Sequence, residues 1–89
     1  MAKEYIYNGF EIDEEPPESF ARRIQDEVKH IGGCVTDSWR HGDPTLGVAK
    51  VTVAFQNRHN LESWIRIYYT QGGLDPDDIE EEVAKIQEA

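Results

Sequence analysis

The amino-acid sequence predicts an α+β fold, a two-layer sandwich in which an antiparallel sheet carries two helices on one face. Three observations predict it. Apolar residues recur with a helical period in two segments, β-branched and aromatic residues alternate with polar ones between them, and an Asn-Gly pair interrupts an aromatic-rich N-terminal stretch. The expected order is β(β)-α-β-β-β-α. Eighty-nine residues without a repeat or linker fit one compact domain, residues 1–89.

The first element is YIYNGFEI, residues 5–12. Asn8 and Gly9 both tolerate positive φ, and between apolar flanks they favour a β-hairpin with a two-residue turn. A single strand with a bulge at Gly9 is the alternative. Pro16 and Pro17 end the strand pattern and suit the first turn of a helix.

A helix is expected over residues 18–31. Its apolar side chains are four, four and three positions apart, which places them on one face: Phe20, Ile24, Val28 and Ile31. Gly32 and Gly33 predict its end, because one glycine can adopt the left-handed C′ conformation.

Two strands follow. The first is CVTDSWR, residues 34–40, with Val35 and Trp39 on the same side, and the loop HGDPTLG comes after it. The second is VAKVTVAF, residues 48–55, whose side chains alternate between two faces. Val51, Val53 and Phe55 are expected on the buried face, and Lys50, Thr52 and Ala54 on the more solvent-exposed face.

SWIRIYYT, residues 63–70, is expected as the third strand because β-branched and aromatic residues follow one another in it. In such a strand Ile65, Ile67 and Tyr69 would face the core. Trp64, Arg66 and Tyr68 would lie on the opposite face. A helix over the same residues is the alternative.

The last element is a helix that begins at Asp75 as N-cap, with Pro76 at N1 and Asp78 at N3 as its capping-box-like partner. Leu74 and Ile79 can form a hydrophobic staple. The expected buried stripe is apolar at helical spacing: Ile79, Val83 and Ile86.

The sequence carries no recognisable catalytic or cofactor motif. The candidate metal ligands include neither two histidines at i, i+4 nor a Cys-x-x-Cys pair: His30, Cys34, His41, Asp43 and His59. We therefore expect no enzymatic activity, no metal and no cofactor. No apolar run approaches the roughly 18 residues of a membrane span. A single cysteine favours a reducing compartment, the cytoplasm.

The negative charge is concentrated at the two ends of the chain. Residues 1–18 and 74–89 carry net charges of −5 and −6, whereas residues 19–73 carry +2. Such acidic segments keep a small protein soluble, and they can also bind a basic partner.

From residue 18 onward the expected order α-β-β-β-α resembles that of the double-stranded RNA-binding domain, over about 70 residues and in topology alone. The resemblance implies a basic cluster at the start of the second helix that contacts phosphates. The matching positions here are acidic and oppose phosphate: Asp75, Asp77, Asp78, Glu80 and Glu81. No functional residue is therefore carried over.

We expect a small acidic protein-binding module that occupies a basic, nucleic-acid-binding surface of a partner protein. In size and charge the chain resembles phage-encoded antagonists such as anti-CRISPR and anti-restriction proteins. Its expected partner-binding residues are acids of both ends and three anchors: Asp13, Glu14, Glu15, Glu18, Asp77, Glu80, Glu81, Glu82, Glu88, Trp64, Tyr68 and Arg58. Neither direct contact with nucleic acid nor a membrane is expected, and self-association stays open.

The alternative function is nucleic-acid binding by a sheet face. Trp64, Arg66 and Tyr68, with Lys50, would combine aromatic rings that stack on bases with cations that attract phosphate.

Overall fold

The computed structural model describes residues 3–12, 15–42 and 48–89. In chain order its elements are β1 (Tyr5–Ile12), α1 (Pro17–Val28), the 3₁₀ helix η1 (Lys29–Ile31), β2 (Gly33–His41), β3 (Val48–Phe55), α2 (Arg58–Gln71), α3 (Pro76–Val83) and β4 (Gln87–Glu88). The strands form one antiparallel sheet in the order β2-β3-β1-β4. The predicted α+β class is therefore confirmed.

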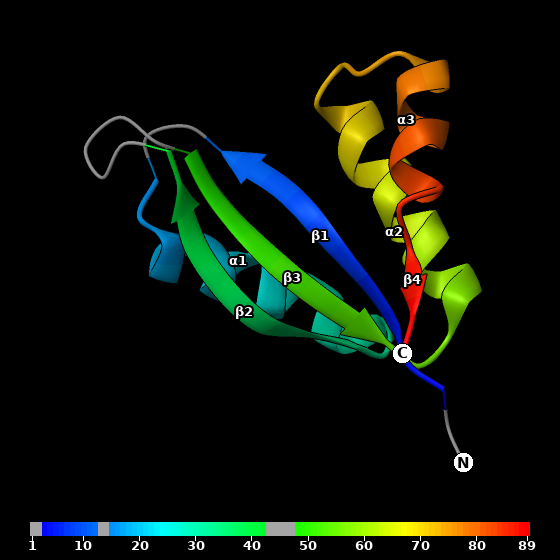
Figure 1. The fold of residues 1–89 in the computed structure, drawn as a ribbon, viewed down its shortest axis with the longest axis horizontal. Coiled ribbons are helices and arrows are strands. Elements are labelled where there is room, and N and C mark those ends of the chain that lie inside the picture. The colour runs from blue at the N-terminus through cyan, green and yellow to red at the C-terminus, as the bar shows by residue number, and fades with distance from the viewer. Residues whose placement is uncertain (1–2, 13–14, 43–47) are drawn as a thin grey trace.

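The core lies on one face of this sheet. Figure 1 shows α1 behind β2 and β3, and α2 and α3 beside β1 and β4. The helices and β3 meet in one cluster of buried side chains, which includes Phe20, Ile24, Val28, Ala49, Val51, Val53, Phe55, Leu61, Trp64 and Ile65. Val51, Val53 and Phe55 of β3 are buried and Lys50 and Thr52 are partly exposed, as predicted, but Ala54, expected on the more solvent-exposed face, is buried as well. Among the described residues, no helix covers the face of β2 and β3 that is turned to the viewer in Figure 1.

β1 is a single strand, so the hairpin prediction is wrong and the bulge alternative is correct. Its register with β3 shifts between Asn8 and Phe10, which leaves Gly9 as the extra residue. A Cβ atom on Gly9 would lie only 3.0 Å from the hydroxyl of Tyr7. Pairing with β3 along the whole strand is incompatible with a turn at this point, because a turn would fold half of β1 away from its partner.

α1 confirms the first predicted helix. Phe20, Ile24 and Val28 are fully buried, and Gly32 has the left-handed φ of 86° expected after a helix end. Ile31 differs from the prediction. It lies in η1, beyond the part of the helix that packs on the sheet, and is 37% exposed.

β2 is confirmed as a strand, but Val35 and Trp39, predicted to lie on the same side of it, lie on opposite faces. A second bulge shifts the register between Val35 and Asp37. Val35 therefore pairs with Val53 on the core side, whereas Trp39 pairs with Lys50 on the uncovered side. One extra residue reverses the alternation of everything after it.

The third predicted strand is wrong, because residues 63–70 belong to α2. The helix begins after Asn57, whose side chain accepts a hydrogen bond from the Asn60 amide at 3.1 Å. Trp64 then stacks on Phe55 with ring centroids 6.2 Å apart. With a helix in place of the third strand, the order that resembled the double-stranded RNA-binding domain is lost.

α3 begins as predicted, with Asp75 at the N-cap and Pro76 at N1, although the Asp75 side chain makes no capping hydrogen bond. The helix ends earlier than predicted, at Val83. Ile86 is buried beyond that end, and the chain then extends into β4, which pairs with Tyr5 and Ile6. Across the described ranges, no helix combines the length and apolarity needed to cross a bilayer.

Candidate functional site

The acids of the C-terminal segment divide into two groups. The first group is bound within the protein. Glu80 accepts two hydrogen bonds from the Arg66 guanidinium, at 2.9 and 3.1 Å, and these hold the pKa of the Glu80 carboxyl below its usual value. Glu82 accepts hydrogen bonds from Lys85 and from the Tyr7 hydroxyl. Glu88 lies 2.8 Å from the ammonium of Lys3.

The second group consists of four exposed carboxylates, none of which forms an ion pair with a cation of the described residues: Asp75, Asp77, Asp78 and Glu81. The three within the helix project away from the buried residues Ile79 and Val83, because α3 turns about 100° per residue. We call these four residues the α3 acidic surface. Asp75 and Asp78 belong to it although the sequence predicted capping roles for them and not partner binding.

Of the expected partner-binding acids near the N-terminus, the two that the structure describes, Glu15 and Glu18, are not brought to this surface. Glu15 forms an ion pair with Arg23 at 3.0 Å, and Glu18 is exposed in the first turn of α1. Figure 1 shows the start of α1 and the whole of α3 at opposite ends of the molecule. Asp13 and Glu14 lie outside the described residues. Glu15 and Glu18 therefore do not form a single patch with the acids of α3.

The three predicted anchors occupy quite different environments. Trp64 is only 6% exposed and belongs to the core, so it cannot contact a partner without unfolding. Tyr68 is half-buried, with its ring 5.5 Å from that of Trp64. Arg58 is exposed at the start of α2 and forms an ion pair with Glu62 at 3.0 Å.

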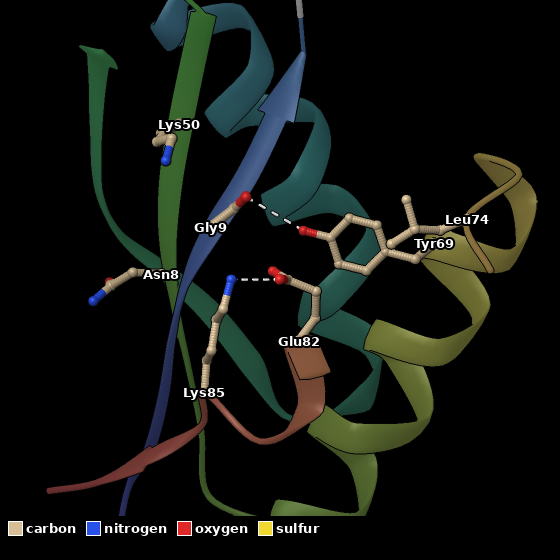
Figure 2. A pocket seen from close by; sticks show the side chains of 7 residues that line it. All are labelled: Asn8, Gly9, Lys50, Tyr69, Leu74, Glu82 and Lys85. Atoms are coloured by element: carbon tan, nitrogen blue, oxygen red, sulfur yellow. Dashed lines mark hydrogen bonds and ion pairs between the residues drawn. The ribbon is translucent and has the colours of Figure 1, made fainter. Parts of the chain in front are cut away.

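A polar cluster that the sequence did not reveal lies between β1 and the α2–α3 pair. Tyr7, fully buried on β1, donates its hydroxyl proton to Glu82 of α3. The Tyr69 hydroxyl of α2 lies 2.9 Å from the Tyr7 oxygen and 3.3 Å from the Gly9 carbonyl oxygen. Figure 2 shows Tyr69 and Glu82 pointing toward the bulge of β1 from two different helices.

The protons of this cluster can be assigned by counting donors. Each phenol has a single O–H group, and that of Tyr7 is used on Glu82. The proton between the two hydroxyls is therefore supplied by Tyr69, which divides it between Tyr7 and the Gly9 carbonyl. Tyr7 and Tyr69 thus form a directed chain that ends on the Glu82 carboxylate.

Burial and the hydrogen bond to Glu82 both raise the pKa of Tyr7 far above its usual value, so the phenol stays neutral. For Glu82, burial favours the protonated form, but hydrogen bonds from Lys85 and Tyr7 outweigh it and the pKa of the carboxyl lies below its usual value. The cluster therefore holds one carboxylate in its charged state beside a neutral phenol.

No group of three or more potential metal ligands gathers in the part of the chain that the structure describes. Of the residues considered from sequence, Cys34 is exposed on β2 and His41 is exposed at the end of the same strand. Asp43 lies outside the described residues.

In comparisons with known proteins, neither a family model, nor a curated protein, nor a solved structure matches this chain.

Proposed function

We propose that this chain is a small acidic protein-binding module that occupies a basic, nucleic-acid-binding surface of a partner protein, in the manner of phage-encoded antagonists. Its contact surface is the α3 acidic surface. The observation that supports the proposal is that neighbouring acids of α3 differ in their partners. Glu80 and Glu82 form ion pairs with cations of this protein, whereas Asp77, Asp78 and Glu81 are exposed and form none within the part of the chain that the structure describes.

The energetics of α3 support this assignment. Asp77 and Asp78 lie in the first turn, where carboxylates interact favourably with the helix dipole. Glu81 lies one turn further on, directly after Asp77 on the same face, and like charges at this spacing repel each other by a few tenths of a kcal/mol. Cations of a partner would remove that repulsion. Attraction of this kind also accelerates association and weakens as salt increases.

Most of the residues expected to bind nucleic acid in the competing function do not lie on a sheet face. Trp64 is buried, while Arg66 and Tyr68 lie on a helix and Arg66 is bound to Glu80. Lys50 does lie on the uncovered sheet face, with Trp39 as its cross-strand partner. These two residues define the surface on which this alternative now rests.

The experiment is affinity capture with the immobilised protein, followed by elution with salt and with competing double-stranded DNA. The test variant combines Asp77→Asn, Asp78→Asn and Glu81→Gln. The control combines Glu4→Gln, Asp26→Asn and Glu27→Gln, which removes the same number of exposed carboxylates from other elements. We expect a nucleic-acid-binding protein that the wild type and the control retain, that DNA displaces, and that the α3 variant loses.

Retention of the same protein by all three variants would remove the α3 acidic surface from the proposal. A gel shift with single- and double-stranded DNA and RNA tests the competing function. Nucleic-acid binding that is lost in Trp39→Ala and Lys50→Met, with no captured protein, would replace the proposed function with that one.

A further inference from the structure

A hollow of about 360 Å³ lies beside the bulge of β1, facing α2 and the start and end of α3. Gly9 lacks a side chain at its floor, and Tyr69, Leu74 and Glu82 line the helical side. Figure 2 shows these residues around the hollow, with Lys85 beneath Glu82 and Lys50 on β3 across the bulge. The volume is at the lower end of the range of small-molecule sites, and equals that of roughly twelve water molecules at about 30 Å³ each.

The groups around the hollow are rich in hydrogen-bond donors. The Lys85 ammonium has three N–H groups and donates one of them to Glu82, and the Lys50 ammonium brings a second positive charge to the lining. Glu82, the only carboxylate among the lining residues that the structure describes, already accepts from Tyr7 through one oxygen and from Lys85 through the other. The lining therefore offers donors and positive charge to a ligand, and few acceptors.

Hydrogen bonds within the protein also fix the positions of the groups that line the hollow. Tyr7 and Tyr69 fix the position of Glu82 through buried and half-buried hydroxyls, and Glu82 in turn holds the Lys85 ammonium. The side chain of Glu82 is only 18% exposed, which distinguishes it from the solvated acids of the α3 acidic surface. Lys85 is thus held by a pre-organised carboxylate, as binding sites require of their polar groups.

From this geometry we infer a binding site for a small organic anion, with a carboxylate or phosphate head group between Lys50 and Lys85 and a short apolar part against Leu74. Leu74 is 38% exposed and provides the apolar wall. The site is separate from the α3 acidic surface, whose charge would repel such a ligand. The inference does not depend on the proposed partner.

The test is an NMR titration of the ¹⁵N-labelled protein with hexanoate, hexyl phosphate, acetate and hexylammonium. We expect hexanoate or hexyl phosphate to shift the amides of Gly9, Tyr69 and Glu82 with a Kd of about 1 mM, as suits a ligand of this size. Comparison of the first two anions identifies the preferred head group. Acetate should bind more weakly because it lacks a chain to contact Leu74, and hexylammonium should cause no shift at these amides.

Four variants make the result specific. Lys85→Met and Lys50→Met should each weaken anion binding about tenfold, as expected for the loss of a charge-assisted hydrogen bond. Lys85→Arg keeps the charge and should retain binding even if Lys85→Met proves unstable. Lys29→Met removes an exposed lysine that also pairs with an acid, Asp26, and should bind like the wild type. Thermal unfolding of each variant checks the fold.

The inference is overturned if none of the anions shifts these amides at concentrations up to about 20 mM, far above the expected Kd. It is equally overturned if Lys50→Met and Lys85→Met together bind as tightly as the wild type, or if hexylammonium shifts the same amides as hexanoate. Failure here would leave the capture experiment on the α3 acidic surface unaffected.

Discussion

Removing the hydroxyl of Tyr7 tests how β1 is joined to α3. Tyr7 is fully buried, and Tyr7→Phe deletes the donor to Glu82 together with the acceptor that Tyr69 faces at 2.9 Å. A hydrogen bond to a charged group contributes about 1.5–3 kcal/mol, and Glu82 would keep Lys85 and some contact with water. We therefore expect a loss of about 2 kcal/mol, toward the lower part of that range, or about 10 °C in Tm for a domain of this size.

The loss should also depend on pH. The pKa of Glu82 is lower in the folded protein than in the unfolded chain, so its contribution to stability is present above the unfolded pKa, about 4.3, and disappears as the pH falls through the folded value. Since Tyr7→Phe removes one cause of that shift, the difference between wild type and variant should be largest at neutral pH and shrink in acid.

Urea unfolding followed by circular dichroism at pH 7 and at about pH 3 measures both quantities. Tyr5→Phe is the matched control, because Tyr5 lies on the same strand and its hydroxyl makes no hydrogen bond to the described residues. If Tyr7→Phe costs no more than Tyr5→Phe, or if its cost is the same at both pH values, the assignment of Tyr7 as donor to an ionised Glu82 is wrong.

Three further predictions concern the fold and are measured by the same unfolding experiments. Gly9→Ala should cost about 2 kcal/mol because Gly9 has a positive φ of 156° and because its Cβ would also crowd the Tyr7 hydroxyl. Gly32 also has a positive φ, but a Cβ there would meet no atom within 4 Å, so Gly32→Ala should cost only about 1 kcal/mol of backbone strain, and equal costs would argue against the crowding. Trp64→Ala should lower the free energy of unfolding by about 3–5 kcal/mol, because it truncates a core side chain. A loss below about 1 kcal/mol would show that Trp64 lies at the surface and not in the core. Asn57→Ala should cost about 1 kcal/mol through loss of the N-cap of α2, while an unchanged stability would show that the capping bond contributes nothing.

Much of the secondary structure could be predicted from local sequence patterns, but such a pattern gave the wrong element for α2. Over residues 63–70 the alternation of β-branched and aromatic side chains fits a strand. The helical signal begins earlier, in residues 56–62, which precede the alternating segment. Leu61, Trp64, Ile65 and Tyr68 have the i, i+3, i+4, i+7 spacing of a helix face, and Asn57 is a good N-cap. A window that included Asn57 and Leu61 would have favoured the helix.

The bulge in β2 had no comparable signal. Neither glycine nor proline marks Thr36, and the shift depends on pairing with β3 and on α1, where the Gln25 side chain accepts the Val35 amide hydrogen bond at 2.8 Å. Asn8-Gly9 did mark an irregularity in β1, but whether it formed a turn or a bulge depended on the length of β3 available for pairing.

The candidate site could be predicted only in part for the same reason. Local sequence identified an acidic helix and its capping residues. It could not identify which acids are neutralised, because Arg66 and Glu80 are 14 positions apart and Tyr7 and Glu82 are 75 apart. These pairs form when α2 and α3 pack against each other and against β1. Only in the folded protein do Asp75, Asp77, Asp78 and Glu81 differ from the other acids of the C-terminal segment, because they form no ion pair with a cation of the described residues.

Calorimetric titration of the captured partner, at several salt concentrations, tests the central claim most directly. The account predicts that the variant Asp77→Asn, Asp78→Asn, Glu81→Gln binds at least about tenfold more weakly than the wild type at low salt, and that the difference narrows as salt screens the charges. The control variant Glu4→Gln, Asp26→Asn, Glu27→Gln should bind like the wild type. Equal affinity of the α3 variant and the wild type at low salt would contradict the account.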